Sequence, residues 1–139
     1  MNIKRRSGFT LLEVIIVIII IGVLASLALP RLFSTIEFAR ANEAMSAFQA
    51  LRGSLERCYL ARGGNYTGCQ VNSNLDVQDP AGSINAHFTY TISGQSVTDY
   101  TITARRNTRD GGNTADIVQL SQTSSAITRT GTGAFAGIQ

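Results

Sequence analysis

The first thirty residues set a strongly apolar segment apart from the rest of the chain. A predominantly apolar run extends from Phe9 to Leu29, ends at Pro30 and contains a single charged residue, Glu13. As a helix that rises ~1.5 Å per residue, this run would reach roughly 30 Å, the thickness of the hydrocarbon core of a bilayer. The pattern therefore predicts one membrane-spanning helix.

Beyond Pro30 the pattern becomes that of an amphipathic helix that continues to about Arg62. Apolar residues recur at steps of three and four and form one stripe: Ala41, Ala44, Phe48, Leu51, Leu55 and Cys58. Two pairs off the stripe, Glu37 with Arg40 and Arg52 with Glu56, are spaced for weak ion pairs. The stripe fits a coiled-coil seam or the face of a helix beneath a sheet. With only about three heptads, we favour the sheet.

The C-terminal half alternates apolar and polar residues in the manner of β-strands. Such alternation begins at Phe88 and again at Tyr100, and further strands are expected near Ala115–Ser121 and Ser125–Thr130, followed by a tail. Residues 63–85, rich in Gly, Asn, Ser and Asp, are expected to form a surface loop. The predicted fold class is α+β: a long N-terminal helix with a small antiparallel sheet of three or four strands packed on its C-terminal half.

The positive charge of the chain is concentrated before the apolar run. Lys4, Arg5 and Arg6 supply the whole formal excess of +3, and without them nine arginines face nine acidic residues. Cations at this end favour a cytoplasmic N-terminus, with the remainder of the chain outside. A near-neutral remainder without a basic stripe makes nucleic-acid binding an unfavoured function.

Cys58 and Cys69 are the two cysteines, and they flank the predicted end of the helix. Outside the cytoplasm, two cysteines are expected to form one disulfide, which here closes a 12-residue loop onto the helix. Chain-entropy arguments assign such a loop roughly 3 kcal/mol. The rival interpretation is a metal or redox pair, but His87 is the single histidine, so a ligand set would be incomplete.

Three interpretations compete for the apolar run. A simple signal anchor leaves Glu13 unexplained. A secretory signal peptide cut after Ala28 is also conceivable, although the run is longer than the ~7–15 residues usual for its apolar core. In the third interpretation the chain is cut between Gly8 and Phe9, and the apolar helix stays in the mature protein.

A family resemblance supports the third interpretation. Gly8-Phe9-Thr10-Leu11-Leu12-Glu13-Val14, after a short basic leader and before an Ile/Val/Leu run, resembles the prepilin signature of type IV pilins and the related pseudopilins of type II secretion. The resemblance is close over residues 4–62 and covers the rest in outline. It implies four segments: a cleaved leader (1–8), a transmembrane and filament-core helix (9–29), an amphipathic helix (30–62), and a loop-and-sheet head (63–139).

The resemblance also implies processing and assembly. A prepilin peptidase would cut after Gly8, the new amine of Phe9 would be N-methylated, and an assembly platform with its ATPase would polymerise the subunits. The protein would lie in the inner membrane as a single-pass protein and then form a homo-oligomeric helical filament on the cell surface, for adhesion, motility or DNA uptake. Gly22 and Pro30 are the positions where the helix is expected to loosen or bend.

Glu13 is the candidate assembly residue. An ionised carboxylate inside hydrocarbon costs roughly 2.5–3.5 kcal/mol, which makes an intramembrane glutamate a functional hypothesis. The run offers no cation, but cleavage after Gly8 would create one, the α-amine of Phe9. We expect Glu13 to pair with this amine on a neighbouring subunit. The alternative is a glutamate close enough to the interface to stay hydrated.

No enzymatic site can be assembled from these residues, and no cofactor or metal is expected. The sequence contains no phosphate-binding loop, no paired-carboxylate signature and no nucleophile beside a base. The predicted function is therefore structural. One alternative is a type II secretion pseudopilin, which the lack of an evident acidic calcium-binding cluster near the C-terminus disfavours. Another is a minor pilin that acts as a binding subunit.

Overall fold

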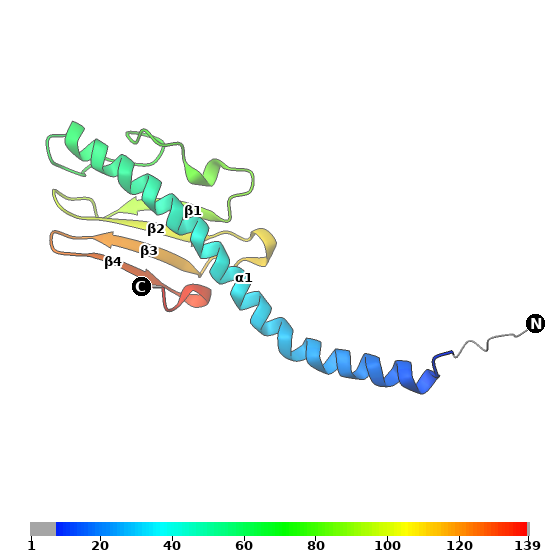
Figure 1. Cartoon of the computed structure of the whole chain (residues 1–139). Coiled ribbons are helices and arrows are strands. Elements are labelled where there is room, and N and C mark those ends of the chain that lie inside the picture. Colours follow the sequence, from blue (N-terminus) through cyan, green and yellow to red (C-terminus); the bar gives the residue numbers. More distant parts are fainter. Residues whose placement is uncertain (1–7, 139) are drawn as a thin grey trace, which may run out of the picture. The chain divides into compact units, whose positions relative to one another are not determined.

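The computed structural model describes residues 8–138, in which one long helix precedes an antiparallel sheet (Figure 1). Helix α1 extends from Leu11 to Ala61. The strands are β1 (Phe88–Ser93), β2 (Tyr100–Arg106), β3 (Ile117–Gln122) and β4 (Ile127–Gly131). Short 3-10 turns η1, η2 and η3 lie at Pro80–Gly82, Arg109–Gly111 and Gly133–Phe135. The fold is α+β, as the sequence predicts.

The chain divides into two compact units between Thr35 and Ile36. In the first unit every described residue is exposed. Helix α1 is long and apolar enough to cross a membrane, because its most apolar window has a mean hydropathy of 3.0 and no buried residue. The helix is continuous through Gly22 and Pro30, so loosening at these two positions stays a prediction.

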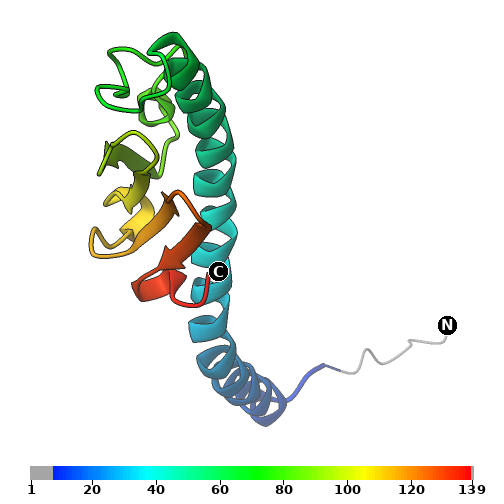
Figure 2. The ribbon, with the colours of Figure 1, turned by 90° about the vertical axis from the view of Figure 1, so that its left-hand side faces the viewer.

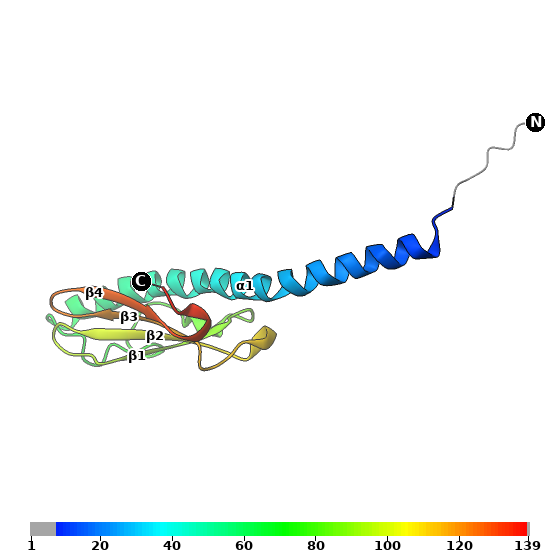
Figure 3. The ribbon, with the colours of Figure 1, turned by 90° about the horizontal axis from the view of Figure 1, so that it is seen from below.

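In the second unit the sheet packs on one face of α1 (Figure 3). All six residues of the predicted apolar stripe are buried. The strand residues that complete this core alternate along β1, β2 and β3: Phe88, Tyr90, Ile92, Tyr100, Ile102, Ala104, Val118 and Leu120. The helix beneath a sheet is therefore the correct interpretation of the stripe.

The sheet is a simple meander in the order β1-β2-β3-β4, with each strand antiparallel to the next. Ile102 pairs with Ile92 on one side and with Leu120 on the other, which places these three apolar side chains on the same face. Strands β1 and β4 form the two edges (Figure 2). The four strands lie within two residues of their predicted positions.

The C-terminal segment differs from the predicted tail. Turn η3 places Phe135 in the core, fully buried, with its ring 5.6 Å from that of Phe88. The Thr132 amide donates to the carbonyl of Ile117 at 2.9 Å and holds the start of the turn against β3. A single aromatic anchor in a segment without periodicity gives no pattern signal, which explains why the sequence prediction was wrong here.

The predicted disulfide joins Cys58 to Cys69, and both cysteines are buried. The loop that it closes is packed rather than loose. Tyr66 is 3% exposed and stacks between Tyr59 and Tyr100, with ring-centre distances of 4.6 and 4.8 Å. The disulfide and the tyrosine stack together hold the start of the loop against the end of α1.

Cys69→Ser is expected to destabilise the second unit without affecting membrane insertion, because the apolar run lies in the first unit. The loss is roughly 3 kcal/mol, or a fall of about 10 °C or more in Tm. Thermal unfolding of the full chain in detergent micelles measures this shift. In the native protein neither cysteine should react with a thiol reagent until a reductant is added. Stoichiometric labelling without reductant would contradict the prediction.

Candidate functional site

The candidate assembly residues lie together at the start of α1. Phe9, Glu13, Val14 and Val17 line a shallow hollow of about 310 Å³ in the first unit. Phe9 is 83% exposed, and Glu13 lies one helical turn further on. Gly8 is the first described residue, so the remainder of the predicted leader, including Lys4, lies outside the described residues.

Glu13 also has a local contact that the sequence reasoning missed. Thr10 precedes the first helical residue, and its side-chain oxygen accepts a hydrogen bond from the Glu13 amide at 3.3 Å. Threonine followed three residues later by glutamate is the signature of a helix capping box, so the signal was present in the sequence. A carboxylate in the first turn is also stabilised by the helix dipole. Thr10 therefore caps the start of the helix, and Glu13 contributes its backbone amide to this cap.

The apolar surface around Glu13 is too large to remain in water. Large apolar side chains from Phe9 to Leu29 are between 41% and 83% exposed. An exposed apolar surface of this extent marks a membrane-binding or protein-binding surface. The exposed apolar part of α1 is therefore suited to contact with lipid or with another protein.

Comparisons with known proteins agree with this geometry. Residues 3–29 match the family described as the prokaryotic N-terminal methylation motif. A type II secretion system core protein G from Aeromonas hydrophila is 49% identical over 53 residues, which cover 38% of this chain and 37% of that protein. The type IV major fimbrial protein FimA from Dichelobacter nodosus is 38% identical over 55 residues, or 40% of this chain and 35% of that protein. In its N-terminal part the chain is thus similar to type II secretion core proteins G and to a type IV fimbrial protein.

The similarity to these proteins is concentrated in part of the chain. A core protein G from Pseudomonas aeruginosa is 30% identical over 80 residues, 58% of this chain and 56% of that protein. The match to the Aeromonas protein spans little more than a third of its length. The matches leave much of this chain uncovered, so the part that contains the sheet must be interpreted from its own residues.

The head contains a buried cation that the sequence reasoning did not find. Arg106, on β2, is 0% exposed. Its Nε donates to Glu37 at 3.0 Å, and its two terminal nitrogens donate to the carbonyl oxygens of His87, Asn107 and Arg109 at 2.9–3.2 Å. A buried guanidinium requires both a counter-charge and full hydrogen bonding. Glu37 supplies the charge, and three backbone carbonyl oxygens supply half of the hydrogen-bond contacts.

Glu37 is held ionised by this arrangement. Burial on its own would raise the pKa of Glu37, but the hydrogen bonds and positive charges of Arg106 and Arg40 outweigh it and lower the pKa below its ordinary value. Arg40 forms the predicted pair with Glu37. The predicted pair of Arg52 with Glu56 is absent among the ion pairs of the described residues. Glu56 accepts a hydrogen bond from Tyr66 Oη at 2.9 Å.

His87 links turn η2 to helix α1 through its two ring nitrogens. Its Nδ1 lies 2.8 Å from Glu43 and its Nε2 lies 3.0 Å from Asp110, while its backbone amide donates to Glu43 at 2.9 Å. The two ring nitrogens face opposite partners, so this histidine and the two carboxylates do not converge on one point. The arrangement fixes the loop of η2 and the start of β1 to α1.

Proposed function

We propose that this chain is a type IV pilin: a structural subunit that lies in the inner membrane, is cleaved after Gly8, is N-methylated on Phe9 and polymerises into an extracellular helical filament. The observation that carries the proposal is the match of residues 3–29 to the N-terminal methylation motif, together with the exposure of every apolar residue in the part of α1 from residue 11 to residue 29. Such a helix needs lipid before assembly and other helices after it.

The partners follow from this life cycle. A prepilin peptidase acts on the bond between Gly8 and Phe9, and an assembly platform with its ATPase supplies the energy of polymerisation. The chain itself acts as building material and not as an enzyme. In the filament, the apolar helices form the core and the heads lie outside, while Glu13 pairs with the methylated amine of Phe9 on a neighbour.

The second candidate is a pseudopilin of a type II secretion system. The observation that favours it is that the first relatives found, from Aeromonas hydrophila and Klebsiella pneumoniae, bear the name of type II secretion core protein G. The two functions share the cleavage, the methylation and the core helix, and differ in where the filament stands. A surface filament indicates a pilin, and a periplasmic one indicates a pseudopilin.

The decisive measurement is the intact mass and N-terminal residue of subunits in filaments sheared from the cell surface. We expect a subunit that begins at Phe9 and carries one added methyl group. A subunit that retains Met1 would contradict the processing. A soluble product that begins after Ala28 would indicate a secreted protein instead of a filament subunit.

A further inference from the structure

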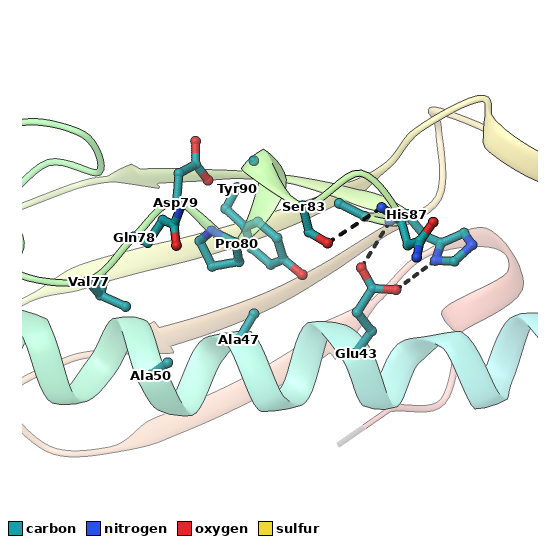
Figure 4. Close-up of a pocket in the computed structure, with 13 residues that line it drawn as sticks. Glu43, Ala47, Ala50, Val77, Gln78, Asp79, Pro80, Ser83, His87 and Tyr90 are labelled. Carbon is teal, nitrogen blue, oxygen red and sulfur yellow. Dashed lines mark hydrogen bonds and ion pairs between the residues drawn. The ribbon is translucent and has the colours of Figure 1, made fainter.

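One flank of α1 borders an acidic hollow in the second unit. The hollow, of about 840 Å³, lies between α1, the loop around η1 and the edge strand β1 (Figure 4). Its lining includes the carboxylates of Glu43 and Asp79 and no lysine or arginine. The small side chains of Ala47 and Ala50 form its floor on the helix and leave room for an incoming side chain.

The polar groups of this hollow retain capacity for hydrogen bonds. Each carboxylate oxygen of Glu43 contacts His87, and those of Asp79 accept from the Ala81 amide and from Asn72. Because an ionised carboxylate has about four acceptor positions, each can accept further donors. Tyr90, another lining residue, is 7% exposed, and its hydroxyl has no hydrogen-bond partner among the described residues. The hollow suits a cationic group with several N–H donors.

The opposite flank of α1 borders a basic hollow. Arg52 and Arg129 line this smaller hollow of about 120 Å³, together with Gln49 and an apolar floor that includes Phe48, and no carboxylate lines it. Neither arginine belongs to an ion pair in the part of the chain that the structure describes. Unlike the buried Arg106, these two arginines form no ion pair with a carboxylate of the described residues.

The two hollows lie on opposite sides of the second unit, which comprises residues 36–139. Residues 43, 47 and 50 of α1 line the acidic hollow, whereas residues 45, 49 and 52 line the basic one, on the other side of the buried stripe. The sheet repeats this separation, because the acidic hollow borders β1 and the basic hollow borders β3 and β4, at the two ends of the strand order. One subunit therefore cannot bring its own two hollows together.

We propose that the basic hollow of one head, through Arg129 and Arg52, docks on the acidic hollow of the next copy of this chain. This inference rests on the proposed filament and names the contact between its heads. Every copy of the chain carries both the acidic and the basic hollow, and the two hollows lie on opposite flanks of α1. A contact between different surfaces of identical subunits extends into an open helical array when the rotation that it imposes does not close into a ring.

The test is a charge exchange in the full chain, expressed as the sole pilin of a filament-forming cell. Arg129→Glu places a carboxylate against the acidic hollow, and Gln78→Arg places a cation in that hollow against Arg129. Gln78 is an exposed lining residue, so its replacement leaves the contacts of Glu43 and Asp79 in place. Each single variant should lower the ratio of filament to membrane-stored subunit by about tenfold, and the double variant should recover most of the loss.

Arg105→Glu is the matched control. This variant makes the same change of charge, but on β2. Arg105 is exposed on the face of the sheet opposite to that which packs on α1, and it lines neither hollow. We expect this variant to assemble as the unaltered protein does. The inference is overturned if Arg129→Glu assembles normally, or if the double variant assembles no better than the single ones. Those results would leave the proposed function in place, whereas an unaltered chain that never forms filaments would overturn both.

Discussion

Glu13→Val is expected to be inserted into the membrane and cleaved after Gly8, yet to be nearly absent from surface filaments when it is the only copy. Valine removes an insertion cost of roughly 2.5–3.5 kcal/mol, so the variant is the better anchor. In the filament core, however, the amine of Phe9 on the neighbouring subunit loses its counter-charge. Removing one partner of a buried charge pair costs about 3–5 kcal/mol. The measurement is the amount of subunit in sheared filaments relative to that in the membrane.

Glu13→Gln separates the proposed pairing of Glu13 with a neighbouring subunit from its place at the start of the helix. Glutamine is favoured at this position of a capping box, as glutamate is, and the backbone amide of residue 13 still donates to Thr10. Only the charge is lost. If the charge of Glu13 pairs with a neighbouring subunit, Glu13→Gln should be nearly absent from filaments, just as Glu13→Val should be. Abundant filaments from Glu13→Gln, with the leader removed, would contradict the pairing of a charge at position 13 with the neighbouring amine.

The sequence was most informative where a period extends over many residues. The steps of three and four from Ala41 to Cys58 identify the buried face of α1, and the alternation from Phe88 to Ile92 identifies the core face of β1. These patterns arise because a regular element that is buried on one side repeats its environment at each turn or each second residue. Fold class and strand positions therefore follow from the sequence.

The groups that depend on contacts between distant segments left no such signal. Arg106 looks like any polar strand residue beside Arg105, yet it is buried, because Glu37 lies 69 positions earlier on α1. The same reason hides the two hollows, since each combines a flank of the helix with loop or strand residues. Glu13 was different: a lone carboxylate in an apolar run is conspicuous through its own chemistry, with no need for a partner in the sequence.

Glu37→Gln is expected to destabilise the head more than any other change of a single charge within it. The substitution keeps a hydrogen-bond acceptor but leaves the guanidinium of Arg106, which is 0% exposed, without a negative partner. Loss of one partner of a buried pair costs about 3–5 kcal/mol, a fall of roughly 15 °C or more in Tm for a domain of this size. Thermal unfolding of the full chain in detergent micelles, followed by circular dichroism, measures it.

The pH dependence supplies a second signature of this pair. Because the pKa of Glu37 is lowered in the folded protein, its stabilisation is present above the unfolded-state pKa and is lost as the pH falls through the folded-state pKa. The unaltered protein should therefore lose its advantage over Glu37→Gln in acid, and the two Tm values should converge there.

Asp76→Asn is the matched control, because it also converts a carboxylate that pairs with an arginine into an amide. Hydrogen bonds from Arg57 and Ser54 lower the pKa of Asp76, but both members of the Arg57–Asp76 pair are more than half exposed. Solvent screening makes such a pair contribute little. Glu37→Gln should therefore unfold at a clearly lower temperature than Asp76→Asn. Equal Tm values for the two variants at neutral pH would show that Arg106 does not depend on Glu37 for its burial.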